Sequence, residues 1–250
     1  MILEIDKLSK SFGGLHAVRE VSLAVRQGTI HSILGPNGAG KTTLFNLVTG
    51  SLAPTSGRVR LCGRDVTGAS PDRLVYQGVA RTFQRTSIFP SLSAAGNIAL
   101  SLRSRRKMNF SLRMPGAVAR ELAAETRRIL RLVGLLEHAD TPAGRMSHGS
   151  QHALDIGIGL ALAPRLLLMD EPLAGMSRGD RQRIGDLIRS LRDEHGLTVL
   201  MVEHDVELVM RLSDTVTVMQ QGAVIAEDRP EEIQRSPAVR KAYLVGEFAS

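Results

Sequence analysis

The sequence predicts an α/β fold that binds its ligand at the ends of parallel strands, and two features carry this prediction. A glycine-rich loop at 35–43 follows a short, largely apolar segment at 28–34 and precedes apolar residues at helical spacing. Two further apolar segments, 166–171 and 198–202, read as buried strands, and a helical segment at 180–192 separates them. Because α/β folds bind ligands at the carboxyl ends of their strands, we expect the functional site where these strands end.

The glycine-rich loop matches the phosphate-loop pattern of Gly, four residues, Gly, Lys and then Ser or Thr. Gly35, Gly38 and Gly40 let the backbone approach a ligand closely, and successive N–H groups then form a nest for an anion. Lys41 supplies a charge for the β- and γ-phosphates, and the Thr42 hydroxyl can bind Mg²⁺. A glycine turn without a ligand is the alternative, but it leaves the Lys and Thr in register unexplained. The predicted nucleotide-binding residues of this loop are Gly35, Pro36, Asn37, Gly38, Ala39, Gly40, Lys41, Thr42 and Thr43.

Polar residues follow the apolar strands downstream. Asp170 is suited to hold Mg²⁺, directly or through water, and Glu171 to act as general base for a water that attacks the γ-phosphate. His204 ends the next strand at the same edge, where it can position the water or sense the γ-phosphate. Gln84 also follows a strand and can contact the metal. The predicted catalytic residues are therefore Glu171, His204 and Gln84, and the predicted metal-binding residues are Thr42, Gln84 and Asp170.

The N-terminal segment reads as strands and turns. Leu3, Ile5 and Leu8 mark one strand, and residues 18–25 form a second. Downstream of the loop and its helix, residues 58–66 read as a hairpin. These segments predict an antiparallel β subdomain attached to the core.

The stretch from about 86 to 150 has a different character, with scattered Pro and Gly and a cluster of basic residues. Residues 117–136 show the apolar spacing of an amphipathic helix, which disfavours a disordered basic linker. We therefore predict one domain over 1–250, in which the core and β subdomain cover 1–85 and 151–250 and a helical insertion covers about 86–150.

The α/β alternation resumes after residue 150. Residues 151–163 read as a helix with Gly157 and Gly159 inside it, for which close approach of another element is a possible reason. Residues 215–226 read as a hairpin, and the polar tail from Asp228 as helical.

The composition, with 43% hydrophobic and 23% charged residues, is that of a soluble globular protein. The longest apolar stretch, 156–169, is interrupted by Pro164 and Arg165, so we expect no membrane span and, from the N-terminal residues, no signal peptide. The single cysteine, Cys62, excludes an internal disulfide and suits a reducing cytoplasm.

The formal charge of +7 permits an acidic partner, a phosphate ligand or an anionic membrane surface and selects none of them. Part of the excess lies in a basic cluster, Arg103–Lys107, either a solvated surface or a surface near a membrane protein. Aromatic residues make up 3% of the chain, which gives thin support for stacking on nucleic acid, and no nucleic-acid partner is expected.

Short motifs follow one another in a fixed order along the chain. They are Phe12, the loop at 35–43, Gln84, the segment 146–150 (Met-Ser-His-Gly-Ser), the segment 166–171, the segment 174–177 (Ala-Gly-Met-Ser) and His204. In this order the chain resembles the ATP-binding subunits of ABC transporters over essentially its whole length. The segments 12–18, 80–84, 174–176 and 202–205 resemble the branched-chain amino acid uptake subfamily, which includes urea and short-amide importers.

The resemblance implies a P-loop ATPase with ATP and Mg²⁺ as its ligands. It implies a head-to-tail dimer with a second ATPase subunit, a copy or a paralogue, in which the Walker A loop of one chain and the signature of the other enclose each ATP. Ser147 and Gly149 would contribute to the partner's ATP, and Phe12 would stack on adenine. Two integral membrane subunits, fed by a solute-binding protein, would hold the dimer at the cytoplasmic face of the inner membrane.

The signature departs from the family pattern of Leu-Ser-Gly-Gly-Gln, because His148 and Ser150 replace a Gly and the Gln. Ser177 stands where Asp is common in the D-loop. These changes predict altered turnover of the ATP that the partner subunit binds. They also predict a heterodimer, in which the better catalytic site combines this chain's Walker motifs with a more regular signature from the partner.

Two other functions use a phosphate loop. A soluble ABC-type ATPase that acts on a nucleic acid or protein usually carries two cassettes, a coiled coil or zinc sites, which this sequence lacks. A small-molecule phosphotransferase would leave Gln84, the signature and His204 unexplained. We therefore expect an ATPase that powers an importer of branched-chain amino acids or related small solutes.

Overall fold

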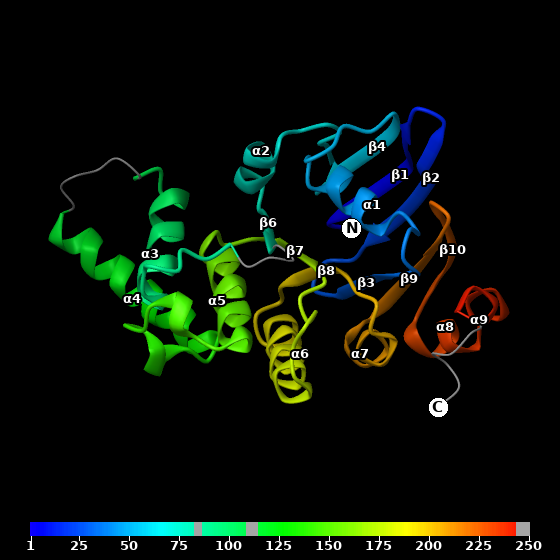
Figure 1. The fold of residues 1–250 in the computed structure, drawn as a ribbon. Coiled ribbons are helices and arrows are strands. Elements are labelled where there is room, and N and C mark those ends of the chain that lie inside the picture. Colours follow the sequence, from blue (N-terminus) through cyan, green and yellow to red (C-terminus); the bar gives the residue numbers. More distant parts are fainter. Residues whose placement is uncertain (83–86, 109–114, 244–250) are drawn as a thin grey trace. The chain divides into compact units, whose positions relative to one another are not determined.

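The computed structural model describes residues 1–82, 87–108 and 115–243, and its chain forms two compact units (Figure 1). Unit 1 consists of Met1–Arg81, Arg165–Glu171 and Arg189–Ser250, and unit 2 of Thr82–Pro164 and Pro172–Ile188. Unit 2 thus includes residues 151–164 and 172–188, which the sequence analysis grouped with the core.

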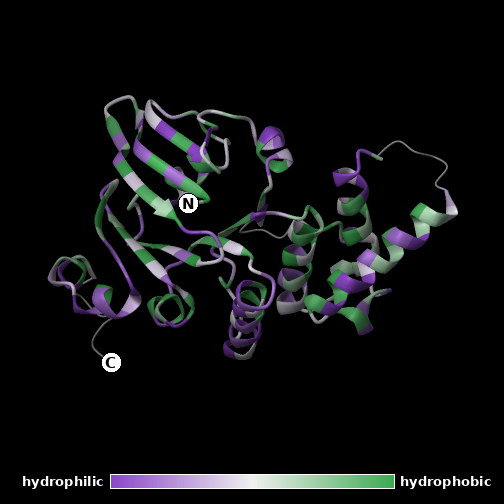
Figure 2. Ribbon diagram, turned by 180° about the vertical axis from the view of Figure 1, so that it is seen from behind, coloured by the Kyte–Doolittle hydropathy of each residue, from purple (hydrophilic) through white to green (hydrophobic). Residues whose placement is uncertain are grey.

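An antiparallel sheet forms the N-terminal part of unit 1. Its strand order is β2-β1-β4-β5, and the bounds are β1 Leu3–Phe12, β2 Leu15–Val25, β4 Ser56–Leu61 and β5 Arg64–Asp65. Leu3 pairs with Val25 on one side and with Leu61 on the other, so apolar side chains share one face of the sheet. The alternating green and purple bands along these strands in Figure 2 show this pattern, and the predicted hairpin at 58–66 is confirmed.

The second sheet of unit 1 is mixed and has the strand order β10-β9-β3-β8-β7-β6. Its strands are β3 Ile30–Leu34, β6 Val79–Thr82, β7 Leu166–Asp170, β8 Thr198–Val202, β9 Thr215–Gln220 and β10 Ala223–Asp228. The neighbouring pairs β3–β8, β7–β8 and β3–β9 are parallel, and every residue of β3, β7 and β8 is buried. Continuous burial explains why these strands read as uninterrupted apolar segments.

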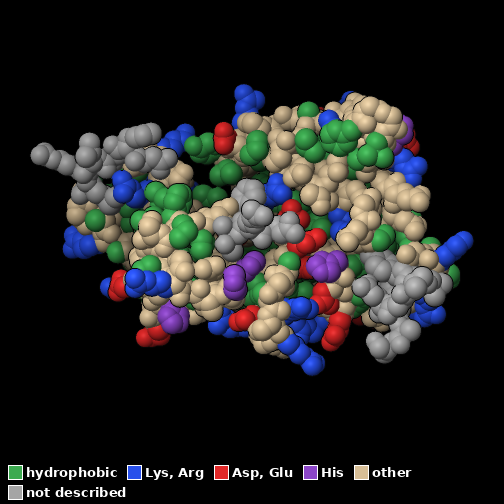
Figure 3. Space-filling view, viewed as in Figure 1, with side chains coloured by type: hydrophobic (Ala, Val, Ile, Leu, Met, Phe, Trp, Pro, Cys, Tyr) green, Lys and Arg blue, Asp and Glu red, His purple; other side chains and the backbone are tan. Residues whose placement is uncertain are grey.

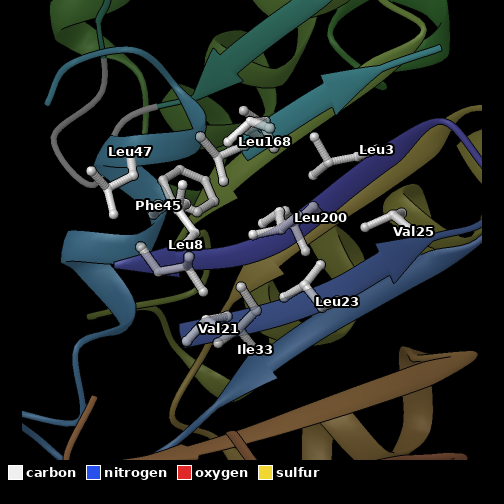
Figure 4. Packing of buried hydrophobic residues seen from close by; sticks show 14 of the residues in the cluster. Leu3, Leu8, Val21, Leu23, Val25, Ile33, Phe45, Leu47, Leu168 and Leu200 are labelled. Atoms are coloured by element: carbon white, nitrogen blue, oxygen red, sulfur yellow. The ribbon is translucent and has the colours of Figure 1, made fainter. Parts of the chain in front are cut away.

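Helices join and flank these strands. Helix α1, Lys41–Val48, follows the phosphate loop, and Phe45 on it is fully buried. Figure 4 shows Phe45 among side chains from both sheets, with Leu8 from β1 and Leu168 and Leu200 from β7 and β8. One apolar core therefore supports both the loop helix and the ends of the central strands. The other helices of this unit are α2 Pro71–Tyr76, α7 Val206–Leu212, α8 Pro230–Arg235 and α9 Pro237–Tyr243.

Unit 2 is helical over its described residues. Helices α3 Ala94–Arg105, α4 Gly116–Leu132 and α5 His148–Ala161 pack against one another, joined by two short 3₁₀ turns, Leu136–His138 and Ala143–Arg145. A side chain at Gly157 would press on Ile98 and Ile129 of the two neighbouring helices, which confirms close approach as the reason for this glycine. Helix α6, Arg178–Asp193, begins in unit 2 and ends in unit 1.

Candidate functional site

The phosphate loop connects β3 to α1 in unit 1, and its glycines are required by close backbone contacts. Gly40 has a φ of 95° directly before α1, and a Cβ there would collide with the carbonyl oxygen of Ala17. A Cβ at Gly35 would meet the carbonyl oxygen of Met219. The N–H of Gly222 also donates to the carbonyl of Ala39 over 3.0 Å. Chain segments from β2 and from the β9–β10 turn therefore fix the shape of the loop.

Lys41 lies within this loop. Its ammonium donates to the carbonyl oxygens of Gly35, over 2.5 Å, and Pro36, over 3.1 Å. Burial lowers the pKa of Lys41, while the carboxylates of Glu171 and Asp170 act in the opposite direction. The Lys41 ammonium can therefore exchange its hydrogen bonds to these carbonyl oxygens for hydrogen bonds to phosphate oxygens.

A cavity of about 650 Å³ opens over the loop, and all of its lining residues belong to unit 1. Its lining includes Asn37, Gly38, Ala39, Gly40, Lys41, Thr42 and Thr43 from the loop, together with Glu171. The volume is in the range of small-molecule sites. The structure therefore brings residues 37–43 of the predicted loop and Glu171 to one cavity.

Asp170 is the last residue of β7, and Glu171, predicted to end the same strand, follows directly after it. The Asp170 side chain is 8% exposed, and that of Glu171 is 23% exposed. Glu171 has a φ of 48°, an uncommon value for a residue other than glycine, and its N–H donates to the carbonyl of Val202 over 2.9 Å. Left-handed backbone in such a residue persists only where its surroundings enforce it, and it occurs often at functional sites.

His204 lies beyond the end of β8, next to these acids. Its Nδ1 is 3.9 Å from Oε1 of Glu171 and 4.0 Å from Oε2 of Glu203. The His204 side chain is 58% exposed, whereas Glu203 is buried and its carboxylate accepts from the His204 backbone N–H over 3.2 Å. The sequence analysis gave Glu203 no role of its own, since nothing in its spacing distinguishes it from a solvated acid.

Arg81 is the site residue that the sequence analysis missed. Its Nη2 donates to Oδ2 of Asp170 over 3.0 Å in an ion pair that is largely buried. Its Nη1 donates to Asn46 over 3.0 Å and to Thr49 over 3.2 Å, both on or next to α1. The guanidinium also lies over the ring of Phe45, 5.1 Å from its centroid. The only signal in the sequence was the position of Arg81 three residues before Gln84.

Not every predicted residue of unit 1 lines the cavity, since Gly35, Pro36, Phe12, Asp170 and His204 are absent from its lining. Gln84 lies outside the described residues. Phe12 is 48% exposed, with Nζ of Lys10 5.2 Å from its ring centroid. It does not belong to the cavity lining, where the adjoining hairpin contributes Leu15, His16, Ala17 and Arg19 instead.

The residues of the predicted signature lie in unit 2, at the start of α5. Ser147 caps this helix, since its hydroxyl accepts from the N–H of Ser150 over 3.3 Å and donates to the Ser150 hydroxyl over 3.0 Å. Helix α5 consequently begins at His148, three residues before the predicted start.

Gly149 is buried against the first turn of α6. A Cβ at Gly149 would collide with the carboxylate of Asp180, which in turn accepts from the Ser177 hydroxyl over 2.8 Å. The Asp180 N–H donates back to the Ser177 hydroxyl over 3.2 Å, so Ser177 caps α6. The D-loop residue and the signature glycine therefore contact the same carboxylate.

Metal binding requires donors of the right chemistry, and the predicted Thr42 and Asp170 offer hydroxyl and carboxylate oxygens, which Mg²⁺ prefers. Among the residues that the structure describes, no group of three or more His, Cys, Asp or Glu side chains forms a metal cluster. This is compatible with a phosphate-loop site, where the nucleotide's phosphates supply further oxygens. No described helix is long and apolar enough to cross a membrane.

Comparisons with known proteins agree with this geometry. The family model described as "ABC transporter" matches residues 18–174, and that described as "Branched-chain amino acid ATP-binding cassette transporter" matches residues 223–244. The chain is 40% identical to the high-affinity branched-chain amino acid transport ATP-binding protein BraF of Pseudomonas aeruginosa, over 97% of each chain. It is 38% identical to the corresponding protein LivG of Salmonella typhimurium, again over 97% of each.

Solved structures give the same result. A nucleotide-free ATP-binding cassette from an ABC transporter superposes with a TM-score of 0.85 at 30% identity, over 98% of this chain and 99% of that one. A cassette in its ADP conformation gives 0.86 at the same identity and coverage. A dimeric bacterial ABC transporter cassette gives 0.76 at 25% identity, over 91% of this chain and 98% of that one. The chain therefore belongs to the ABC transporter family and is one of its ATP-binding, ATP-hydrolysing cassettes.

Proposed function

We propose that this chain powers the import of branched-chain amino acids, or of related small solutes such as urea or short amides, by hydrolysing ATP. The observation that carries the proposal is the similarity to branched-chain amino acid transport ATP-binding proteins, which extends through the C-terminal segment 223–244. Nothing in the comparisons favours a soluble ATPase that acts on a nucleic acid or another protein.

In the proposed mechanism, the loop N–H groups and Lys41 hold the β- and γ-phosphates of ATP. Lys41 exchanges its carbonyl partners, Gly35 and Pro36, for phosphate oxygens, which are the stronger acceptors. Thr42, Asp170 and Gln84 are the residues that would hold Mg²⁺. When bound, this ion would neutralise charge on the phosphates.

Glu171 acts as general base in this mechanism. Its carboxylate takes a proton from water while the water oxygen bonds to the γ-phosphorus and the bond to the β–γ bridging oxygen breaks, which leaves ADP and phosphate. His204, 3.9 Å from Glu171, orients that water or the γ-phosphate. Phe12 would have to turn toward the cavity to stack on adenine.

The proposed assembly is a head-to-tail pair of ATPase subunits, in which the second subunit is a paralogue or a copy of this chain. Ser147 and Gly149 would meet the ATP of the other subunit. Two integral membrane subunits would hold the pair at the cytoplasmic face of the inner membrane, and a solute-binding protein would deliver the solute.

The experiment is uptake by proteoliposomes that contain this chain, its second ATPase subunit, the membrane subunits and the solute-binding protein. Labelled leucine and labelled urea are offered separately, with ATP inside. We expect ATP-dependent uptake of one of these solutes. Glu171→Gln should abolish uptake and retain ATP binding, because the amide nearly matches the carboxylate in shape and cannot accept the proton. ATP hydrolysis without uptake of either solute would contradict the proposed substrate class.

A further inference from the structure

Four charged side chains lie near the end of β7 in unit 1. Arg81 pairs with Asp170 over 3.0 Å, and the carboxylates of Asp170 and Glu171 both act on Lys41. Two cations thus balance two carboxylates, and the nucleotide-free site has no net formal charge from these four groups. The phosphate loop explains Lys41, but it does not explain Arg81.

Arg81 is anchored independently of Asp170. Its Nη1 donates to Asn46 and Thr49, and its guanidinium lies over the ring of Phe45, a fully buried residue of the core. None of these contacts involves Asp170, so they hold the positive charge of Arg81 beside the carboxylate independently of the ion pair.

A fixed guanidinium has a definite effect on metal binding at a carboxylate. It takes up one carboxylate oxygen, and it repels a divalent cation that approaches the other. This repulsion is strong where solvent is largely excluded, and the Asp170 side chain is only 8% exposed.

We propose that Arg81 prevents Asp170 from holding a divalent cation in the absence of nucleotide, so that the metal enters only together with the phosphates. The negative charge of the triphosphate then offsets the charge of Arg81 and makes metal binding favourable. This inference rests on the proposed role of Asp170 as a metal-binding residue.

Mn²⁺ serves as the probe, because electron paramagnetic resonance measures the concentration of unbound Mn²⁺ in solutions of the nucleotide-free protein. We expect Arg81→Met to bind Mn²⁺ on the order of tenfold more tightly than the unmodified chain. The double variant Arg81→Met/Asp170→Asn should lose this gain, because the carboxylate that attracts the ion is gone. Arg81→Lys keeps the charge and should stay near the unmodified chain.

Unchanged Mn²⁺ affinity in Arg81→Met would overturn the proposal, as would a gain that persists in the double variant or appears equally in Arg81→Lys. ADP binding in EDTA shows that each variant is folded. If Arg81→Met does not fold, Arg81→Gln, which retains polar contacts with Asn46 and Thr49, takes its place with the same expected result. The proposed role of Asp170 is tested separately by Asp170→Asn alone, which should weaken binding of Mn²⁺ with ADP.

Discussion

The phosphate loop of unit 1 and the signature of unit 2 are both predicted to bind phosphate, yet their surroundings in the structure differ. In unit 1 the loop lines a cavity, and Lys41 donates to the backbone carbonyls of Gly35 and Pro36, which phosphate can replace. In unit 2, Ser147 is engaged with Ser150, and Gly149 packs against Asp180. The loop can therefore take up a ligand without breaking side-chain contacts. The signature residues, in contrast, already make contacts that stabilise unit 2.

The two motifs differ in how much their function depends on residues far away in the sequence. The phosphate loop works through backbone N–H groups and one lysine, so spacing alone predicts its function. The signature is proposed to act on the ATP of another subunit, and its local contacts restrict which side chains it can carry. The small residue at 149 is required by Asp180 even before any phosphate is considered.

Removing the lysine of the loop should have the largest effect. We expect Lys41→Ala to weaken binding of a non-hydrolysable ATP analogue by roughly 10- to 100-fold, the range for lost hydrogen bonds to a charged group. Isothermal titration calorimetry measures this affinity, with Ser147→Ala in unit 2 as the control, whose affinity in the isolated chain should be unchanged. Equal affinity in Lys41→Ala would count against the loop as the ATP site.

Acid should destabilise unit 1 through a buried histidine of β3. Burial lowers the pKa of His31 to about 4, with a contribution from Arg26, and the ring bonds to Thr217 over 2.7 Å. The pKa of His31 in the folded chain lies below its value of about 6.5 in the unfolded chain. The contribution of neutral His31 to stability is therefore fully present above about pH 6.5 and is lost as the pH falls toward 4.

The expected loss in the free energy of unfolding is about 2 kcal/mol between about pH 7.5 and about pH 5. Urea denaturation at the two pH values measures it, and His31→Gln should remove most of the difference. In unit 2, burial and the neighbouring His148 also lower the pKa of His152, which is only partly buried. If His152→Gln removes more of the pH-dependent loss in the free energy of unfolding than His31→Gln does, the prediction that the acid sensitivity lies in unit 1 is wrong.

The cap of α6 should contribute less. We expect Ser177→Ala to lower the free energy of unfolding by about 1 kcal/mol, because the N–H of Asp180 loses its acceptor. Ser177→Asn, which can still cap the helix, is the matched control and should retain most of the stability. A loss of the same size in both variants would show that the hydroxyl does not act as a cap.

The basic cluster Arg103–Lys107 should show the smallest effect on stability. Arg106 pairs with Glu121 and Glu125, and Arg105 pairs with Glu125. On the face shown in Figure 3, basic and acidic side chains are interspersed. We expect Arg106→Ala to cause a small, salt-sensitive shift in the unfolding midpoint and to leave ATP hydrolysis unchanged. Lost co-purification with the membrane subunits, at unchanged stability, would instead support the predicted membrane-subunit surface.

Much of the fold was predictable because its signals are local. The strands β3, β7 and β8 are buried on both faces and therefore read as continuous apolar segments. The start of α5 was predicted three residues late, since Ser147 was taken only as a signature residue and not as a helix cap.

The site was predictable where chemistry follows spacing, as for Lys41, and not where it depends on distant chain segments. The pairing of Arg81 with Asp170 joins residues 89 positions apart, and no pattern along the sequence encodes it. Glu171 likewise combines a positive φ with a hydrogen bond to Val202 on the neighbouring strand, 31 positions along the chain.

We propose that this chain contributes a complete set of Walker residues and an altered signature, so that the two ATP sites of a heterodimer are unequal. The direct measurement is ATP turnover of the reconstituted pair that carries either Glu171→Gln in this chain or the equivalent change in its partner. We predict that Glu171→Gln removes most of the activity and that the partner's change removes less, because His148 and Ser150 weaken the site that relies on this chain's signature. Equal losses, or a larger loss from the partner's change, would contradict this account.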